Sequence, residues 1–284
     1  MLVEKPVSLS LADYDSMLQS AYMSNKYLQD GTMFVHHPRT NFIMNNKTLL
    51  KKVGSIHRVD ASFTFLGDDE FLNHDIRTSE YGDPLGCIGD LGWYCVRFGL
   101  LVFGDSFVES AKVVHVEMNS KGVPIDATCL VSFGNNRMLS FHCSFRYPLN
   151  QRFQIIGSKD LLTIDDLILP KEGCNSFSLH NQYLTEFDKY TVHSHHEPKI
   201  ESNAVQEVLM WKHFSQVASS LDAASEMDST QWICACSIIG KECQRESKIS
   251  YQTQKIINGL MKSAKSNGEK IHLWDITSWL YEKV

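Results

Sequence analysis

The sequence lacks an apolar run long enough to cross a membrane, a signal peptide and a basic stripe. A transmembrane helix needs about 20 consecutive apolar residues, and no run in the chain approaches that length. The N-terminal segment MLVEKPVSLS has neither a basic region nor a long apolar core, so no secretory leader is predicted. The net charge of -6 argues against non-specific binding to nucleic acid or to an anionic membrane. We therefore expect a cytoplasmic protein that binds neither nucleic acid nor membrane.

The chain also lacks a framework of paired cysteines and a clear metal motif. Its 8 cysteines are scattered, and without a leader they indicate reduced thiols in a cytosolic protein. Cys234-x-Cys236 with Cys243 does not have the paired C-x-x-C spacing of structural zinc sites. The histidine-rich segment 193–196 has no second pair at a fixed spacing, and we assign it to a solvated loop. No metal site is predicted.

The composition is that of a globular protein, and its 284 residues suffice for one large domain or two ordinary ones. The chain opens with an apolar fragment at 1–3, a helical pattern of about 14 residues that begins at Leu11, and a strand pattern over 27–35. Ser10 and Asp13 have the spacing of a capping box at the start of the helix. Strand–helix–strand is the unit of a parallel sheet with a crossover helix.

The rest of the chain is predicted to contain strands followed by helices. Segments rich in Val, Ile, Phe and Thr predict strands at 55–66, 111–118, 123–133, 138–147, 153–156 and 161–169. A hairpin signal at 134–136 indicates that neighbouring strands run antiparallel. Apolar residues recur at helical spacing over 204–221, where Trp211 and Phe214 are assigned to the core, and again over 253–264. The predicted fold class is α+β, an open antiparallel sheet with helices on one face.

The segment Asp83 to Gly99, DPLGCIGDLGWYCVRFG, contains a local pattern that suits proton chemistry. Glycines punctuate its first half, so it begins as loop and turn and becomes helical after Gly89. Asp90 and Tyr94 are four apart, which places a carboxylate and a phenol on one helical face, about a turn apart. Such a pair can transfer protons, but it is also common in ordinary structure.

Five segments, taken in order, resemble those of the glucose–fructose oxidoreductase/inositol dehydrogenase (Gfo/Idh/MocA) family. They are VEKP at 3–6, HHPRT at 36–40, FLNHDIR at 71–77, GCIGDLGWYC at 86–95 and ISYQTQ at 249–254. Each is weak alone, but their order and distances are similar to those of the family over nearly the whole chain. Within the family, the sequence resembles the dihydrodiol-dehydrogenase-like branch and plant-type uncharacterised oxidoreductases.

The resemblance implies a two-domain, nicotinamide-dependent oxidoreductase. Residues 1–35 would be the C-terminal strand–helix–strand remnant of a Rossmann domain, and residues 36–284 the family's C-terminal α/β substrate and oligomerisation domain. Hydride transfer would link NAD or NADP to the carbinol carbon of a sugar, polyol or diol, in a homodimer formed through the antiparallel sheet. By position in the family motifs, the catalytic residues would be Lys5, Asp90 and Tyr94. The residues expected around the cofactor are Glu4, Lys5, Pro6, Arg39 and Trp93.

These residue types suit the oxidation of an alcohol. The proton acceptor should titrate near the working pH, whereas a free tyrosine has a pKa near 10. A lysine ammonium beside Tyr94 would stabilise the phenolate and lower its pKa. In the reducing direction the neutral phenol would be the acid, while Lys5 polarises the carbonyl oxygen. Asp90 would hold Lys5 charged or orient the substrate hydroxyl.

The sequence departs from the family pattern in two places. It contains no G-x-G-x-x-G turn, the usual anion site for a dinucleotide pyrophosphate, which indicates N-terminal truncation. Residues 233–248 are interpreted as an insertion without a family counterpart. Two functions stay open. The chain is either an NAD(P)-dependent oxidoreductase or a catalytically inactive truncated member that serves as a dimerisation or binding module. His36 and His37 could contact substrate or start a helix.

Overall fold

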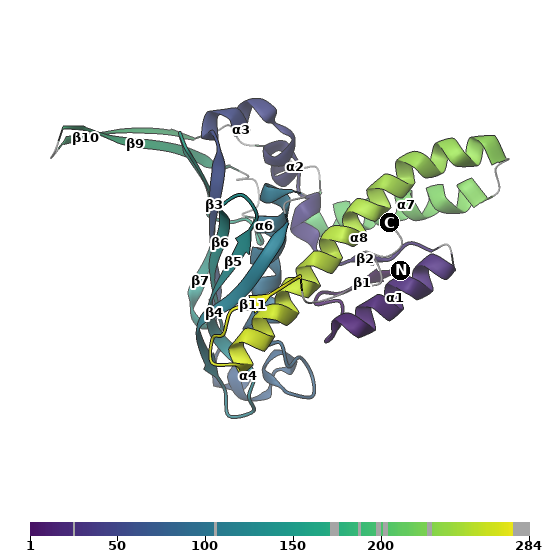
Figure 1. Ribbon diagram of the computed structural model, residues 1–284, viewed down its shortest axis with the longest axis horizontal. Coiled ribbons are helices and arrows are strands. Elements are labelled where there is room, and N and C mark those ends of the chain that lie inside the picture. Colours follow the sequence, from purple (N-terminus) through teal and green to yellow (C-terminus); the bar gives the residue numbers. More distant parts are fainter. Residues whose placement is uncertain are drawn as a thin grey trace.

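A large twisted sheet forms the main body of the molecule (Figure 1). The computed structural model describes residues 1–24, 26–104, 107–170, 176–186, 189–196, 200, 204–225 and 229–274. Within these residues the sheet has nine strands, in the spatial order β10 (Lys189–His196), β9 (Ser178–Glu186), β8 (Leu161–Ile164), β7 (Arg146–Gly157), β3 (Ile56–Leu66), β6 (Arg137–Ser144), β5 (Pro124–Phe133), β4 (Val108–Met118) and β11 (Ile271–His272).

Neighbouring strands of this sheet pair antiparallel, apart from the central pair β3 and β6, which run parallel. After β3 the chain crosses to β4, next to the edge of the sheet, through four helices and then returns strand by strand to β6. These helices are α4 (Asp69–His74), η2 (Ile76–Thr78), α5 (Gly86–Asp90) and α6 (Gly92–Phe103). The predicted fold class, an α+β open antiparallel sheet, is confirmed, with one parallel pair at its centre.

The long helices α6 and α8 (Ser229–Lys265) lie on the same side of the sheet (Figure 1). Alternate residues of the central strands point towards α6, and Val59, Phe63, Leu139 and Phe141 are buried there. Burying such a side chain contributes about 1.5–3 kcal/mol. Gly99 brings α6 close to β6, because a Cβ at this position would lie 2.9 Å from Cδ2 of Leu139. The prediction of helices on one sheet face agrees with this arrangement.

The first 35 residues form the predicted strand–helix–strand unit. Strands β1 (Leu2–Val3) and β2 (Gln29–Asp30) pair in parallel and are joined by α1 (Leu11–Met23). The predicted strand over 27–35 is wrong beyond Asp30, where the chain enters the 3-10 helix η1 (Met33–His36). Oδ1 of Asp30 accepts a hydrogen bond from the backbone N–H of Thr32 at 3.0 Å, and this Asx turn ends the strand.

A buried polar network attaches this unit to the rest of the chain. Asp30 forms an ion pair with Arg97 of α6 and accepts a hydrogen bond from the hydroxyl of Ser250 of α8. Nε1 of Trp93 donates to Oγ1 of Thr32 at 2.8 Å. Burial alone would raise the pKa of Asp30, but Arg97 and the hydrogen bonds outweigh it and hold that pKa below its usual range. A division into domains at residue 35 stays a prediction.

Two helices follow the 3-10 helix η1, namely α2 (Pro38–Asn45) and α3 (Lys47–Val53). The side chain of Asn46 accepts from the N–H of Leu49 at 3.0 Å and starts the second one. The predicted helix over 204–221 is present as α7 (Gln206–Ser225), but Trp211 is 58% exposed. Its buried face contains Met210 and Val217, so the assignment of Trp211 to the core is wrong.

The hairpin of β9 and β10 was missed because its residues are mostly polar. The histidine-rich segment 193–196 belongs to β10 and not to a loop, so that assignment is wrong. Segment 233–248 continues the helix α8 without a break, and its interpretation as an insertion stays a prediction. The side chains of Cys234, Cys236 and Cys243 lie outside the described ones.

The described cysteines line the core beneath α5 and α6. Cys87, Cys95, Cys129 and Cys143 are buried and form no disulfide. The segment Gly86–Phe103, in contrast to the expectation from the sequence, is apolar and long enough to span a membrane, but 83% of it is buried inside the protein. That burial is typical of a helix that belongs to a protein core.

Candidate active site

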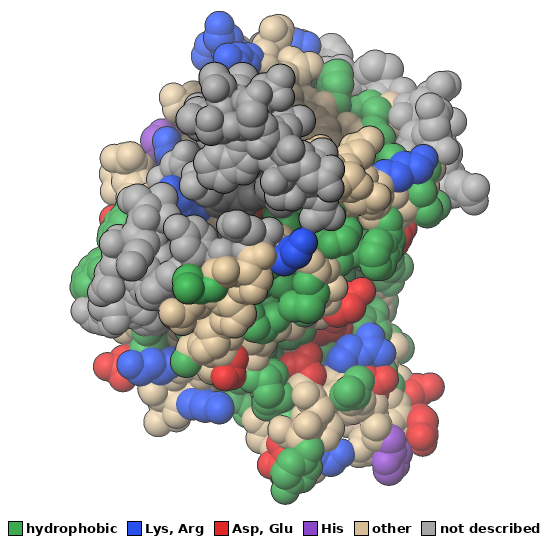
Figure 2. Space-filling model, turned by 90° about the vertical axis from the view of Figure 1, so that its right-hand side faces the viewer, with side chains coloured by type: hydrophobic (Ala, Val, Ile, Leu, Met, Phe, Trp, Pro, Cys, Tyr) green, Lys and Arg blue, Asp and Glu red, His purple; other side chains and the backbone are tan. Residues whose placement is uncertain are grey.

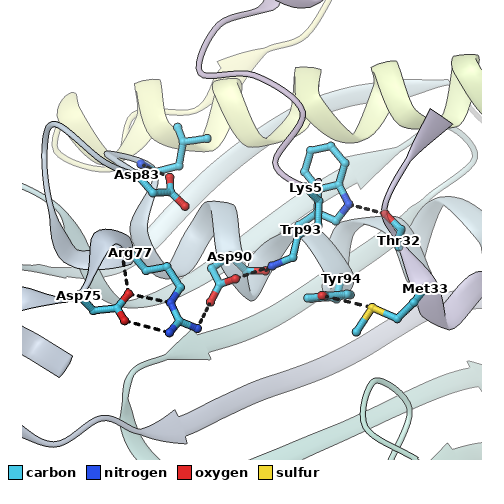
Figure 3. Close-up of polar contacts among 10 residues, drawn as sticks. Lys5, Thr32, Met33, Asp75, Arg77, Asp83, Asp90, Trp93 and Tyr94 are labelled. Atoms are coloured by element: carbon cyan, nitrogen blue, oxygen red, sulfur yellow. Dashed lines mark hydrogen bonds and ion pairs between the residues drawn. The ribbon is translucent and has the colours of Figure 1, made fainter. Parts of the chain in front are cut away.

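Three elements bring the predicted catalytic residues together (Figure 3). Lys5 follows β1, Asp90 is the last residue of α5, and Tyr94 lies in the first turn of α6. Gly86, at the start of α5, has a φ of 53° and packs so closely on β5 that a Cβ would lie 2.2 Å from the carbonyl oxygen of Pro124. Because glycine alone tolerates both constraints, this turn fixes where α5 begins, and Asp90 follows one helical turn later.

Lys5 makes the contacts that join the site. Its ammonium forms an ion pair with Oδ1 of Asp90 and donates a hydrogen bond to the backbone carbonyl of Asp90 at 3.0 Å. It also lies over the ring of Tyr94, 4.6 Å from the centroid. The side chains of Lys5 and Asp90 are only 10% and 12% exposed. The predicted meeting of Lys5, Asp90 and Tyr94 is thus present in the structure, whereas their catalytic roles stay predictions.

The electrostatics of Lys5 and Tyr94 differ from the expected ones. Burial lowers the pKa of Lys5, but the Asp90 carboxylate and then Tyr94 outweigh it, so the net pKa lies above the ordinary lysine value. Burial raises the pKa of Tyr94, and the opposing effect of Lys5 is too small to reverse it. The expected net lowering of the Tyr94 pKa is therefore wrong. Lys5 is held as an ammonium and Tyr94 as a neutral phenol.

A second charged group borders the pair. The guanidinium of Arg77 is held by both oxygens of Asp75, at 2.8 Å from Nε and 3.1 Å from Nη2. It stacks on Phe71, and its Nη1 lies 3.9 Å from Oδ2 of Asp90. A bidentate fork of this kind fixes the orientation of the guanidinium. Arg77 is therefore a fixed cation at the exposed side of the Lys5–Asp90 pair.

Asp83 lies on the turn before α5, and its carboxylate points to the same space as Arg77 and Asp90 (Figure 3). Figure 2 shows acidic and basic side chains interspersed on one face of the molecule, with no large area of a single sign. The cations of the site already have carboxylate partners, since Lys5 pairs with Asp90 and Arg77 with Asp75. Such a site suits a neutral hydroxylated ligand better than an anionic one.

The other residues predicted around the cofactor fall into two groups. Glu4 and Pro6 flank Lys5; Glu4 is exposed and Pro6 partly buried. Arg39 is fully buried in an ion pair with Asp166, and its Nη1 also donates to the carbonyl of Ser176 at 3.0 Å. Trp93 is fully buried as well, in the network of Thr32. Contact of Arg39 or Trp93 with a cofactor stays a prediction, and both side chains have structural partners instead.

The sequence left open whether His36 and His37 contact substrate or start a helix. His37 starts α2, because its Nδ1 accepts a hydrogen bond from the N–H of Arg39 at 3.1 Å.

Sequence reasoning missed Asp75, Arg77 and Asp83 as members of the site. Arg77 is the last residue of the FLNHDIR segment and Asp83 is the first residue of the glycine-rich segment. No local sequence pattern indicates that either residue lies near Lys5. Within the part of the chain that the structure describes, no group of three His, Cys, Asp or Glu residues could hold a metal ion.

The fold and the site define a class of protein, an α+β domain with a strand-end lysine paired to an aspartate on a glycine-rich helix start. Residues 50–163 match the family model of the GFO/IDH/MocA C-terminal domain. Trans-1,2-dihydrobenzene-1,2-diol dehydrogenase of Mus musculus is 24% identical over 172 residues, covering 61% of this chain and 50% of the mouse protein. The same enzyme of Oryctolagus cuniculus is 26% identical over 163 residues, covering 57% of this chain and 47% of the rabbit protein.

Solved structures agree in fold. An inositol dehydrogenase homolog from Azotobacter vinelandii, complexed with NAD+, matches with a TM-score of 0.74 at 12% identity, covering 95% of this chain and 71% of that one. A 3-ketoreductase from Actinomadura kijaniata, in complex with NADP and TDP-benzene, matches with a TM-score of 0.68 at 18% identity, covering 92% and 70%. The chain is thus similar to the Gfo/Idh/MocA family, most directly over residues 50–163. It spans about half the length of the curated relatives it matches.

Proposed function

We propose that this chain acts in the NAD(P)-dependent interconversion of an alcohol and a carbonyl on a neutral diol, polyol or sugar-like substrate. The observation that carries the proposal is the buried Lys5–Asp90 pair, formed by residues 85 positions apart in sequence. The similar proteins include a diol dehydrogenase and a 3-ketoreductase, which supports the reaction class. The balanced charges around Lys5 and Arg77 support a neutral substrate.

The residues present fit one end of a nicotinamide cofactor. Glu4, Lys5 and Pro6 follow β1 at the carboxyl end of a parallel strand pair, where α/β sheets bind dinucleotides. These residues would hold the nicotinamide side, and no G-x-G-x-x-G turn for the pyrophosphate occurs in the sequence. When bound, the nicotinamide supplies or accepts the hydride. The chemistry of this chain's own residues is therefore proton transfer and positioning.

Lys5 is the proton-transferring group in this proposal. Because its pKa is raised, it is an ammonium at neutral pH and can donate a proton to a carbonyl oxygen as the carbonyl carbon gains the hydride. In the oxidising direction it must first lose that proton, so oxidation requires higher pH. Asp90 holds the ammonium in place with its carboxylate and its backbone carbonyl. Tyr94 supports it with the face of its ring.

The test combines binding and turnover with the full chain. Titration with NADH and with NADPH, followed by nicotinamide fluorescence, should give saturable binding of at least one of them. Trans-dihydrodiols, inositols and simple sugars should then be screened for oxidation, and the matching carbonyl compounds for reduction. Saturable binding with turnover that disappears in Lys5→Met supports the proposal. Absence of both binding and turnover would contradict it, and would leave the second candidate below.

The second candidate is a binding or dimerisation module without catalysis. It is favoured by apolar side chains exposed where β3 ends and β7 begins, namely Leu66, Tyr147 and Leu149. In either case we propose a homodimer formed through the sheet, in a cytosolic protein. Light scattering after size-exclusion chromatography should give twice the monomer mass. Leu149→Lys should return the chain to a monomer if this surface forms the contact.

A further inference from the structure

Arg77 is a cation of the site to which the proposed reaction assigns no role. Asp75 occupies one edge of its guanidinium, since Nε and Nη2 donate to the two carboxylate oxygens at 2.8 and 3.1 Å. The backbone N–H of Arg77 donates to Oδ1 of the same carboxylate at 2.9 Å, and Cζ lies 4.7 Å from the centre of the Phe71 ring. These contacts fix the guanidinium plane and leave the remaining nitrogen, Nη1, for another partner.

The carboxylate of Asp90 divides its two oxygens between two cations (Figure 3). Oδ1 pairs with the Lys5 ammonium, whereas Oδ2 lies 3.9 Å from Nη1 of Arg77. That separation is longer than an N–H···O hydrogen bond, which usually measures about 2.7–3.2 Å. Oδ2 and Nη1 are therefore an acceptor and a donor separated by a gap that one small polar group can bridge. The Arg77 side chain is 41% exposed, so the gap lies towards the surface of the site.

The chemistry of this acceptor and donor selects the group that can bridge them. A hydroxyl can accept from Nη1 and at the same time donate to Oδ2, with its oxygen about 2.8 Å from each. A carboxylate or phosphate could accept from Nη1, but its negative charge would face that of Oδ2. An ammonium could donate to Oδ2, but it has no lone pair with which to accept from Nη1. The pair therefore matches a neutral hydroxyl better than a charged group.

We propose that Arg77 is a specificity-determining residue whose Nη1, together with Oδ2 of Asp90, binds a second, unreacting hydroxyl on the carbon next to the reacting one. The inference rests on the function proposed above, in which Lys5 exchanges a proton with the reacting oxygen. The two oxygens of one carboxylate place the positions at Lys5 and Arg77 side by side, as the hydroxyls of a vicinal diol lie on neighbouring carbons.

The second hydroxyl takes no part in the transfer itself. In the oxidising direction a hydride leaves the reacting carbon for the nicotinamide, and the proton of the reacting hydroxyl goes to neutral Lys5. The C–O bond of that carbon becomes a carbonyl, while the neighbouring hydroxyl keeps its bonds. A vicinal diol thus gives an α-hydroxy carbonyl compound. Because Asp75 holds the guanidinium in place before the ligand arrives, little side-chain entropy is lost on binding.

Binding of the second hydroxyl can be measured on the full chain without cofactor. The chain is labelled with ¹³C at the arginine Cζ atoms, and Arg77→Lys assigns the Arg77 signal by NMR. Separate samples are titrated with trans-1,2-cyclohexanediol, with 1,3-cyclohexanediol and with cyclohexanol. We expect the 1,2-diol to shift the Arg77 signal in a saturable way. The 1,3-diol and cyclohexanol, which cannot place a neighbouring hydroxyl between Nη1 and Oδ2, should leave it in place at the same concentrations.

Turnover gives a second measurement that a purely structural role would not reproduce. kcat/KM is determined for a 1,2-diol and for the analogue that lacks the second hydroxyl. Arg77→Met should lower kcat/KM for the diol about 10–100-fold more than for the analogue, because only the diol loses a hydrogen bond to a charged group. Arg77→Lys, which keeps the charge but not the fork held by Asp75, is the second variant if Arg77→Met does not fold.

Arg152→Met is the matched control for both measurements. Arg152 also pairs with an aspartate, Asp165, but the two side chains are 58% and 63% exposed. The control should leave the binding of the 1,2-diol and the ratio of kcat/KM between diol and analogue as they are in the wild type.

Three results would overturn the proposal. The first is that no compound shifts the Arg77 signal, in which case the gap holds water only. The second is that cyclohexanol shifts it as the 1,2-diol does, and the third is that Arg77→Met lowers kcat/KM for diol and analogue by the same factor. If the 1,2-diol binds selectively and no turnover is found, the hydroxyl site stands and the proposed oxidoreductase function fails. If both compounds are turned over and Arg77→Met does not distinguish them, the function stands and the role of Arg77 is wrong.

Discussion

The ammonium of Lys5 lies over the face of the Tyr94 ring, 4.6 Å from its centroid, while the phenol hydroxyl donates to Sδ of Met33 at 3.5 Å. A cation over an aromatic face gains about 0.5–2 kcal/mol, depending on how far it is desolvated. The ring of Tyr94, held edge-on by Phe63 at 5.6 Å, is therefore one part that positions the lysine. The side chains of Tyr94 and Lys5 also interact by a hydrogen bond, which favours the ammonium.

Substitutions should distinguish the contribution of Lys5 to turnover from that of the Tyr94 hydroxyl. Lys5→Met removes the proposed proton donor and should lower turnover by roughly 10²–10⁴-fold. Tyr94→Phe keeps the ring under the ammonium and should cost much less, whereas Tyr94→Leu removes the ring and should approach the loss of Lys5→Met. Steady-state kcat and KM are the measurement, with circular dichroism to verify folding. Equal losses in Tyr94→Phe and Lys5→Met would show that the hydroxyl, not the ring, is used.

The ion pair between Asp30 and Arg97 gives a prediction about stability. Asp30→Asn leaves the Arg97 guanidinium buried without a counter-charge, which typically costs about 3–5 kcal/mol. The wild-type contribution is lost as the pH falls through the native pKa of Asp30, because that pKa lies below the unfolded value. Urea unfolding at neutral pH measures the loss.

The matched control for Asp30→Asn is the exposed pair of Asp165 and Arg152, whose side chains are 63% and 58% exposed. Asp165→Asn should change the free energy of unfolding by only about 0–1 kcal/mol, because water screens an exposed pair. If both substitutions have the same small effect, the network of Asp30, Arg97 and Ser250 does not attach the strand–helix–strand unit to the sheet domain in the way the structure indicates.

The fold was largely predictable because its elements have strong local signals. Helix α1 and strands β3, β4 and β5 follow apolar periodicity closely, and their burial patterns keep that period. Strands β9 and β10 have no apolar alternation, so nothing in their sequence distinguishes them from a loop. The parallel pairing of β3 with β6 depends on a crossover through four helices, which local patterns do not specify.

The site was predictable only in part. Lys5 and Asp90 are far apart in sequence, and their motifs resemble the family's, but no local pattern brings them together. The direction of the Tyr94 pKa depends on burial, which raises it more than Lys5 lowers it, and burial is not visible in a pair of residue types. Asp83 and Arg77 were missed for the same reason, since a charge on a turn acquires its role from neighbours that only the fold supplies.

Gly86 should be the most sensitive glycine near the site. In Gly86→Ala the new Cβ would meet the carbonyl oxygen of Pro124 at 2.2 Å, and a φ of 53° adds a cost of about 1–3 kcal/mol. Gly122→Ala is the control, because Gly122 also has a positive φ, 75°, but no atom within 4 Å of a Cβ. Thermal unfolding should show the larger loss for Gly86→Ala. Equal losses would mean that backbone conformation alone, and not the close approach to β5, is the constraint.

The surroundings of His36, formed by Gln29 and His213, predict how stability depends on pH. Nε2 of His36 lies 3.1 Å from the amide nitrogen of Gln29, which can donate only to a neutral ring, and the ring of His213 lies 5.0 Å away. Burial, and then His213, lower the pKa of His36 to about 4 from the ordinary 6.5. Between these values the unfolded chain binds more protons than the native one, so stability should rise with pH from about 4 to 6.5. His36→Asn removes this titration and should flatten the slope in urea unfolding measured across that window. A slope that is the same in His36→Asn and in the wild type would mean that His36 is as easily protonated in the native state as in the unfolded chain.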